Sequence, residues 1–513
     1  MNRQHKGFKI VRTVPAILLA AISLAPVAVA QTEPSMLDPR LDVRKFVSGL
    51  TTPTTLSFIN ENDIFVLEKN TGKVRRVING VLQPSAVLQL PVNFFSERGL
   101  LGIALHPNFK KNRFVYLYWT ESSTGTVTGN PADVLLLGNR VDRFVWNGSM
   151  LTFDKNLIRL RAFQADEGQP LRGNHNGGRI MFEPKKNDDE RADKDQENES
   201  EKQKRKLLIL IGDNGRRGFM QNVQQGFGPA TCEARPSGPR CDDQFGGPEP
   251  DNAHLTGVIL RLNDDGTTPN DNPFFKAGAE IGGEVGANIQ KVFAYGVRNS
   301  FGLAFDPLSG NLWDEENGSD SFDEINRVDA GANNGWVQIM GPVERIRDYK
   351  SIEIASGARL QQRRWPPESI ADTPREALDR LFVLPGSHYN DPKFSWKNEL
   401  PPAAIGFVKG EGLGEELEGD LFVGAATTRT VGGYLFHFKL TKDREDIDLT
   451  ASGLSGRVAE NPQKDDLTGS ESLLIGRDFG IGTDIVTGPN GNLFVVSLTK
   501  GAIYEIFRRP SDD

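Results

Sequence analysis

Short runs of alternating hydrophobic and polar residues recur along the chain, separated by turns rich in Gly, Asn and Pro. Residues 54–78 (TTLSFINENDIFVLEKNTGKVRRVI) and residues 483–506 (TDIVTGPNGNLFVVSLTKGAIYEI) contain the same unit of three such runs joined by two turns. Further copies begin at Leu100, Gly177, Phe301 and Gly419. A hydrophobic period of two residues is typical of half-buried antiparallel strands. The pattern therefore predicts six copies of a small antiparallel sheet.

A sheet of this size cannot bury its own faces and has to pack against its neighbours. Four-stranded sheets that pack radially form a β-propeller, which leaves few sheet edges exposed. The sequence thus predicts an all-β fold, a six-bladed β-propeller of four-stranded antiparallel sheets over residues 44–510, preceded by an N-terminal segment at residues 31–43. Because the first and last units are alike, we expect the last sheet to lie beside the first and close the ring.

Two segments interrupt the repeats and are predicted to be long loop insertions. Residues 185–206 carry eight acidic and eight basic residues in 22 positions, a composition that favours a solvated hairpin tip. The second insertion is predicted at residues 341–400. Within it, residues 373–384 (TPREALDRLFVL) begin with Thr and Pro, which predicts an N-capped short helix. We expect this insertion to cover one mouth of the propeller.

The first thirty residues have the pattern of a secretory signal peptide. Four basic residues precede an apolar run at residues 14–25, and the small residues Ala28 and Ala30 follow. The pattern predicts cleavage after Ala30 and a periplasmic or secreted protein. The alternative for this segment is an uncleaved membrane anchor. No later stretch reaches the length that crosses a bilayer, so no stable membrane span is expected after cleavage.

The charge balance disfavours nucleic acid as a partner. The chain has 60 Lys and Arg against 68 Asp and Glu, and removal of four basic residues with the first thirty leaves 56 against 68. A net charge of −12 does not suit a protein that binds phosphate backbones. The only two cysteines, Cys232 and Cys241, lie in a Gly- and Pro-rich segment, and an oxidising compartment would favour a disulfide between them.

Polar residues that the fold does not require occur just before two predicted inner strands. His175 lies in GNHNGG at residues 173–178, where a neutral imidazole would face the mouth as a general base. Arg298 and Asn299 precede the strand at Phe301 and suit a developing oxyanion or a planar acidic ligand. A salt bridge from Arg298 to a neighbouring blade is the alternative. His437 lies on a predicted strand and is interpreted as structural.

Residues 316–324 (ENGSDSFDE) gather carboxylates and main-chain oxygens in one turn. Hard oxygen ligands of this kind suit calcium, although the spacing differs from that of an EF-hand.

Five ordered motifs carry a resemblance to a known family. They are residues 98–109 (RGLLGIALHPNF), 174–179 (NHNGGR), 212–216 (GDNGR), 296–307 (GVRNSFGLAFDP) and 323–336 (DEINRVDAGANNGW). Together they resemble the soluble glucose/sorbosone dehydrogenases that depend on pyrroloquinoline quinone (PQQ) and fold as six-bladed propellers. The similarity runs from about residue 44 to residue 508 and is broken at the two insertions.

The resemblance implies catalytic roles for three residues. His175 would take the hydroxyl proton of the sugar as hydride passes to the quinone. Asn174 stands where the family usually has an Asp that orients this histidine, so a low rate is expected from the loss of a carboxylate. Arg298 would stabilise negative charge on the quinone oxygen. Asn299, Arg216 and Arg429 are assigned to cofactor binding.

The resemblance also implies a calcium site and a substrate contact. Main-chain carbonyls of Gly318 and Ser319 would hold the calcium that polarises the quinone. Asp323 and Glu324 look like the family's nearby acidic pair, which supports that loop or a second calcium. Glu97 stands where the glucose enzyme has a polar residue near the substrate.

One departure from the family concerns the cofactor. The glucose enzyme holds the PQQ carboxylates with a Lys and an Arg-x-Arg pair, and here the pair falls on Ile481 and Thr483. Charge-assisted hydrogen bonds contribute roughly 1.5–3 kcal/mol each, so weak PQQ binding is expected.

Three functions are compatible with these features. The first is a periplasmic or secreted dehydrogenase of sugars or related polyols that uses PQQ and calcium and passes electrons to an unidentified acceptor. The second is a non-catalytic propeller of the same fold that binds a carbohydrate or a protein. The third is a calcium-dependent hydrolase similar to the lactonase propellers.

Overall fold

The computed structural model describes residues 32–163, 173–184, 204–215, 254–356, 367–427, 432–450, 453–454 and 456–510. Residues Glu33–Asp513 form one compact unit, and the fold below is that of this unit. Several predicted features lie outside the described residues: the signal peptide, most of the charged insertion, Cys232, Cys241, Arg216 and Arg429.

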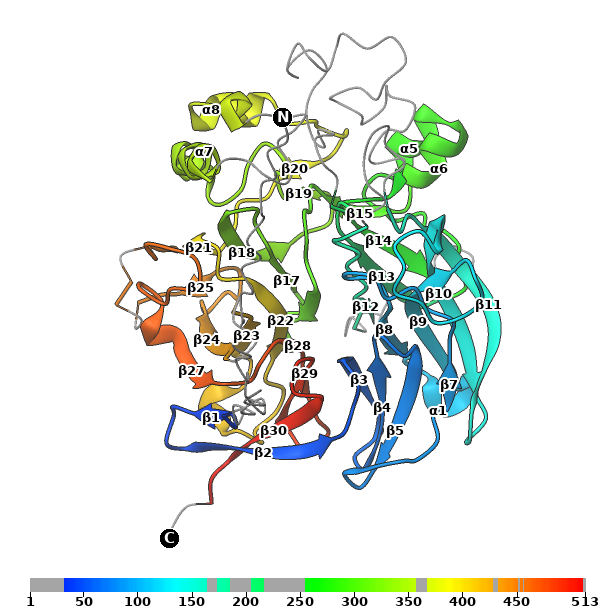
Figure 1. The fold of residues 1–513 in the computed structure, drawn as a ribbon. Coiled ribbons are helices and arrows are strands. Elements are labelled where there is room, and N and C mark those ends of the chain that lie inside the picture. Colours follow the sequence, from blue (N-terminus) through cyan, green and yellow to red (C-terminus); the bar gives the residue numbers. More distant parts are fainter. Residues whose placement is uncertain are drawn as a thin grey trace, which may run out of the picture. The chain divides into compact units, whose positions relative to one another are not determined.

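Six small sheets are arranged around a common centre (Figure 1). We number them as blades in the chain order of their innermost strands. Blade 1 contains β3 (Pro53–Asn60), β4 (Asp63–Glu68), β5 (Lys73–Ile78), β6 (Val81–Leu82) and β7 (Leu88–Gln89). Blade 2 contains β8 (Leu100–Leu105), β9 (Phe114–Ser122), β10 (Val134–Trp146) and β11 (Leu151–Leu160). Blade 3 contains β12 (Ile180–Phe182), β13 (Lys206–Ile211), β14 (Val258–Asn263), β15 (Val292–Tyr295), β19 (Ala332–Asn333) and β20 (His388–Tyr389).

The remaining three sheets complete the ring. Blade 4 contains β16 (Gly302–Phe305), β17 (Leu312–Glu316), β18 (Ser321–Val328), β21 (Phe394–Asn398) and β26 (Val458–Ala459). Blade 5 contains β22 (Pro402–Phe407), β23 (Leu421–Ala425), β24 (Tyr434–Leu440), β25 (Ile447–Asp448), β27 (Leu474–Arg477) and β1 (Ser35–Met36). Blade 6 contains β28 (Gly482–Thr487), β29 (Leu493–Ser497), β30 (Ala502–Arg508) and β2 (Leu41–Ser48). The arrangement confirms the predicted all-β, six-bladed propeller.

The hydrophobic core lies between the blades. All residues of β4 and β29 are buried, because each central strand is covered by a neighbouring sheet on both faces. Between blades 4 and 5, the ring centroids of Trp396 and Phe436 are 5.2 Å apart, and Trp313 is fully buried in the same cluster. Aromatic side chains thus fill the widening space between radial sheets.

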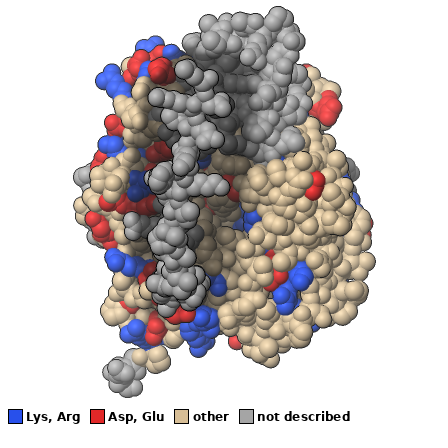
Figure 2. All heavy atoms as spheres, in the orientation of Figure 1, with Lys and Arg blue, Asp and Glu red and all other residues tan. Residues whose placement is uncertain are grey.

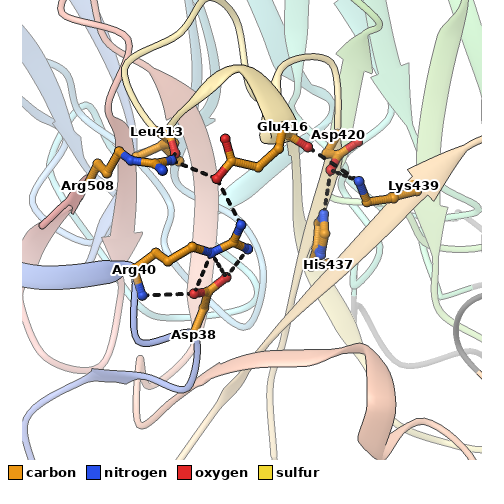
Figure 3. Close-up of polar contacts among 8 residues, drawn as sticks. All are labelled: Asp38, Arg40, Leu413, Glu416, Asp420, His437, Lys439 and Arg508. Atoms are coloured by element: carbon orange, nitrogen blue, oxygen red, sulfur yellow. Dashed lines mark hydrogen bonds and ion pairs between the residues drawn. The ribbon is translucent and has the colours of Figure 1, made fainter. Parts of the chain in front are cut away.

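The ring is closed by the N-terminal strand. Strand β2 pairs with β30 as the outer strand of blade 6, while β28 contacts both β22 and β3. The first unit therefore lies beside the last, as predicted, and the chain before it also completes the last sheet. Near this closure, Arg40 and Arg508 both donate to Glu416 Oε1, at 2.8 and 2.7 Å (Figure 3). Glu416 belongs to η4 (Glu415–Leu417), so these contacts tie blade 6 to blade 5.

The described part of the second insertion contains four short helices. It includes η2 (Val343–Arg345), α7 (Ile346–Ala355), η3 (Pro367–Ser369) and α8 (Pro374–Asp379). Thr373 caps α8 by accepting a hydrogen bond from Glu376 N at 3.2 Å, in agreement with the sequence pattern. Strand β21 is the fourth strand of blade 4, so the insertion ends before Phe394 rather than at residue 400. The other helices are α1 (Phe109–Asn112), α5 (Phe275–Ile281), α6 (Gly283–Ile289) and η5 (Glu471–Leu473).

The surface carries charges of both signs. On the face shown in Figure 2, Lys and Arg lie among Asp and Glu. Among the described residues, no helix has the length and hydrophobicity needed to cross a membrane.

The closing strand offers a stability test. Leu41 on β2 is fully buried, so Leu41→Ala should lower the free energy of unfolding by about 2–5 kcal/mol, as for other buried leucines. Arg44 lies on the same strand, is 62% exposed and pairs with Glu505; Arg44→Ala should cost about 0–1 kcal/mol. Urea unfolding of both variants measures the difference. Equal effects would show that β2 is not part of the cooperative core.

Candidate functional site at the mouth of the propeller

The predicted site residues meet at one end of the propeller because of the directions of the strands. In a four-stranded antiparallel blade, the segment that leads into the first strand and the turn from the second to the third strand lie at the same end. His175 precedes β12 and Arg298 precedes β16. Asp213 follows β13, while Gly318 and Ser319 connect β17 to β18. Blades 3 and 4 therefore supply all five residues to one mouth.

His175 is held by a carboxylate. Its Nδ1 lies 2.5 Å from Asp213 Oδ1, and the other carboxylate oxygen accepts a hydrogen bond from Trp336 Nε1 at 3.0 Å. His175 and Asp213 are both buried. The contacts fix both the position of the imidazole and the nitrogen that carries its proton, because Nδ1 has to donate to the carboxylate.

The expectation that His175 lacks an orienting carboxylate is wrong. Asn174 does not take that role: its Oδ1 accepts a weak hydrogen bond from Ser96 Oγ at 3.4 Å. Asp213, from the GDNG turn, supplies the carboxylate instead. The motif was recognised in the sequence, but its aspartate was not assigned. A carboxylate two positions after the buried run LLILI at residues 207–211 was the available signal.

Arg298 lies beside Trp336, the residue that donates a hydrogen bond to Asp213. Its guanidinium carbon is 5.4 Å from the centroid of the Trp336 ring, and its Nη1 donates to Asn317 O at 2.8 Å. Gly212 permits this approach, since a Cβ there would lie 2.5 Å from Arg298 O and 2.7 Å from His175 O. Gly212 therefore lies close to the backbone of His175 and to the backbone of Arg298, and a larger residue at this position would not fit between them.

The turn between β17 and β18 is fixed from several sides. Asn317 N donates to Asn299 O at 2.7 Å, and Gly318 N donates to Asp323 Oδ1 at 2.8 Å. Gly318 has no room for a side chain, because a Cβ would lie 1.9 Å from Ser321 O. In the described part of the chain, no donor occupies the carbonyl oxygens of Gly318 and Ser319. These oxygens can therefore accept a cation.

Five buried carboxyl groups lie on the two strands that this turn connects. Burial raises the pKa of Asp314 and of Asp323 to about 7 and that of Glu324 to about 8. Burial also raises the pKa values of Glu315 and Glu316 well above their ordinary range, with neighbouring carboxylates adding to the effect. A nearby cation would favour the charged forms.

Asp323 makes a contact that supports the turn, whereas Glu324 holds the backbone at Gly341. Asp323 accepts from Gly318 N and Leu400 N, and Glu324 Oε1 accepts from Gly341 N. Of the two roles expected for this pair, the contacts of Asp323 favour loop support. Across the described residues, no three His, Cys, Asp or Glu side chains are arranged to hold a metal ion. Calcium ligation in this region would therefore rely on main-chain or amide oxygens.

Several buried polar atoms in this region fit a polar ligand. Both amide atoms of Asn214, the Oδ1 of Asn299 and the Oγ of Ser319 have no hydrogen-bond partner among the described residues. All three side chains are buried, where an unpaired polar group costs about 1–3 kcal/mol. Together with the donors of Arg298, these donor and acceptor atoms suit a planar, oxygen-rich molecule.

Glu97 also reaches the site. Its Oε2 accepts a hydrogen bond from His175 N at 2.6 Å. Lys69 holds the same loop through a hydrogen bond from Nζ to Ser96 O at 2.7 Å. Burial lowers the pKa of Lys69 to about 8, while the charge of Glu97 opposes that shift. A carboxylate thus lies against the backbone of the predicted base.

The family model described as Glucose / Sorbosone dehydrogenase matches residues 50–230 and 238–369. The chain belongs to this family. The resemblance seen in the five motifs is thereby confirmed, and membership makes the chain an oxidoreductase of the dehydrogenase type.

Individual relatives agree with the assignment. Quinoprotein glucose dehydrogenase B of Acinetobacter calcoaceticus is 28% identical over 428 residues, which cover 78% of each chain. Aldose sugar dehydrogenase YliI of Escherichia coli is 23% identical over 485 residues, 94% of each chain. The PQQ-bound aldose sugar dehydrogenase of Streptomyces coelicolor has a TM-score of 0.52 at 21% identity, covering 93% of this chain and 98% of its own. That likeness supports the fold.

The predicted departure from the glucose/sorbosone dehydrogenases concerns Ile481 and Thr483, and the structure gives the hydrogen bonds that these two residues make. Thr483 Oγ1 donates to Pro53 O at 3.3 Å, and Ile481 N donates to Thr499 Oγ1 at 3.1 Å. Neither side chain carries a charge for a cofactor carboxylate. Arg216 and Arg429, the two other predicted cofactor residues, lie outside the described residues.

The Asp213 contacts predict a pH dependence. Burial raises the pKa of Asp213, but the charge and hydrogen bond of His175, followed by the charge of Arg298, bring it below the ordinary 3.8. A carboxyl with a depressed pKa stabilises the fold above its ordinary pKa, and this contribution is lost as the pH falls below that value. We expect Asp213→Asn to be less stable than wild type at pH 7, and the difference to shrink below about pH 4. Chemical unfolding at several pH values tests this, and a difference that stays constant down to pH 3 would contradict it.

Proposed function

We propose that the protein oxidises a sugar or related polyol with PQQ as cofactor and calcium as the accompanying ion. The observation that carries the proposal is the meeting of three groups at one mouth: the His175–Asp213 pair, the Arg298 guanidinium, and the carbonyls of Gly318 and Ser319, which have no donor among the described residues. Family membership supports the same reaction class.

His175 is the proposed general base. Since Nδ1 donates to Asp213, the neutral ring carries its lone pair on Nε2 and can take a proton from a substrate hydroxyl there. Asp213 then stabilises the protonated ring, because its buried carboxylate faces the new charge. Glu97, bonded to the backbone of His175, is placed to accept a hydrogen bond from a second hydroxyl of the substrate. A catalytic role for Asn174 stays a prediction.

Arg298, Asn299 and Asn214 are the proposed cofactor contacts, and the carbonyls of Gly318 and Ser319 are the proposed calcium ligands. PQQ, when bound, supplies the hydride acceptor, and calcium supplies a Lewis acid that favours the reduced form. The guanidinium of Arg298 is rigid, because Asn317 O and the Trp336 ring hold it. It therefore presents a fixed positive charge to an oxygen that becomes negative.

The proposed location is the periplasm or the cell exterior. The support is the signal-peptide pattern of residues 1–30, which lie outside the described residues.

A non-catalytic binding propeller is the second candidate. The uncharged Ile481 and Thr483, at the positions of the family's arginine pair, favour it. Such a protein would bind a carbohydrate or a protein at the same mouth without turnover. The hydrolase alternative has no comparable support, since the matched family is one of dehydrogenases.

A single substitution separates the two candidates. With PQQ and calcium added, wild-type protein should reduce a redox dye in the presence of aldoses, and His175→Ala should lower kcat by about 10²–10⁴-fold while PQQ still binds. His437→Ala is the matched control, since His437 is also paired with an aspartate, Asp420, at 2.7 Å (Figure 3), but lies on β24 away from the site. Saturable sugar binding without dye reduction in the wild type would favour the binding module.

The cofactor departure can be tested by restoring charge. We expect the double substitution Ile481→Arg and Thr483→Arg to strengthen PQQ binding at least tenfold, because each new charge-assisted contact contributes about 1.5–3 kcal/mol. Titration followed by PQQ absorbance measures the affinity, with Ile481→Gln and Thr483→Gln as the uncharged control. Equal affinities for the two double variants would show that these positions do not face the cofactor carboxylates.

A further inference from the structure

Helix α7, in the second insertion, presents one polar residue on an otherwise apolar buried face. Ile346, Tyr349 and Glu353 are its buried residues, spaced three and four positions apart as on one side of a helix. Ile346 and Tyr349 join the hydrophobic cluster that includes Phe322 and Trp336. The helix therefore packs against residues of the proposed site, and its third buried position is a carboxylate.

Glu353 is fully buried. A carboxylate is costly to bury unless it accepts hydrogen bonds. Glu353 Oε1 accepts from Asp320 N at 3.1 Å and from Ser321 Oγ at 3.0 Å. Asp320 belongs to the turn between β17 and β18, and Ser321 is the first residue of β18 at the end of that turn. The insertion thus reaches directly to the turn that carries the proposed calcium ligands.

These contacts complete the fixation of the turn. Arg298 and Asn299 hold Asn317 on one side, and Asp323 holds the amide of Gly318. Glu353 holds the other side, at Asp320 and Ser321. Only the stretch between these anchors, with the carbonyls of Gly318 and Ser319, remains free of donors in the described part of the chain.

We propose that Glu353 is a positioning residue that sets the geometry of the Gly318 and Ser319 carbonyls and thereby the affinity of the site for calcium. The inference rests on the proposed function for the calcium itself, and it extends that function by assigning the insertion helix a part in the site. The turn has no disulfide or helical hydrogen bonds of its own, so its conformation depends on outside acceptors. Partners that hold metal ligands in place commonly change metal affinity about 10–100-fold when removed.

The experiment uses the full chain and four variants. Glu353→Ala removes the acceptor, Glu353→Gln keeps an acceptor oxygen without the charge, and Ser321→Ala removes one donor from the turn while leaving α7 unchanged. Asp348→Ala is the matched control, because Asp348 is on the same helix and pairs with Arg345 without contacting the turn. Two quantities are measured: calcium affinity by calorimetry, and hydrogen exchange of residues 317–321 in calcium-free protein.

We expect Glu353→Ala to weaken calcium binding at least tenfold and to speed exchange at the amide of Asp320. Glu353→Gln should stay within about threefold of wild type, and Ser321→Ala should fall between the two. The melting temperature reports whether each variant is folded. If Glu353→Ala does not fold, Ser321→Ala decides: weaker calcium binding than in Asp348→Ala supports the proposal, and equal binding overturns it.

The results separate this inference from the proposed function. Wild-type calcium affinity in Glu353→Ala, or a loss no larger than in Asp348→Ala, overturns the positioning role. Unchanged exchange at Asp320 overturns it as well. If the wild-type protein binds no calcium at all, the calcium part of the proposed function fails. The claim that Glu353 sets calcium affinity is then overturned as well. Faster hydrogen exchange in Glu353→Ala would still show that α7 holds the turn.

Discussion

The hydrogen bond between His175 and the buried Asp213 is the interaction on which the proposed site depends. It joins the segment before β12 to the turn after β13, and the second oxygen of Asp213 extends it to Trp336. Arg298 then lies over the ring of the same indole. A buried carboxylate needs hydrogen-bond donors to offset the free-energy cost of its burial. The donors to Asp213 include His175, the proposed general base, whose orientation the reaction requires. Stability and function therefore depend on the same few contacts.

The propeller scaffold makes this arrangement possible by separating packing from chemistry. Apolar side chains between the blades hold the sheets, while the turns at one end are free to carry polar residues. Glycines then decide how closely those turns approach one another. At Gly212, the absence of a side chain brings the backbones of His175 and Arg298 together. At Gly318, it allows the tight turn whose two carbonyls have no donor among the residues that the structure describes.

Blade 4 departs from the usual composition of a buried sheet. Asp314 has both carboxylate oxygens without a hydrogen-bond partner among the described residues, and its neighbours on β17 and β18 have raised pKa values. Such burial is unfavourable for charged groups. These carboxyl groups lie on the two strands that the turn proposed to bind calcium connects. The insertion helix α7, through Glu353, adds one more carboxylate to this region and uses it to hold the turn.

Hydrophobic periodicity and turn residues were enough to predict the repeated sheets, the ring and the positions of His175 and Arg298, because strand alternation and strand direction are local properties of the chain. The motifs were also enough to indicate the family. The order of residues along the chain did not reveal that Asp213, 38 positions after His175, binds the imidazole of His175. It also did not reveal that Asn174, the residue next to His175 in the chain, does not bind that imidazole. The contact of Glu353 with the turn could not be predicted from the sequence either, since a carboxylate on a helix of an insertion has no distinctive sequence pattern. Such partners are brought together only when blades and insertion pack, because the contact is set by three-dimensional proximity across turns rather than by spacing along the chain.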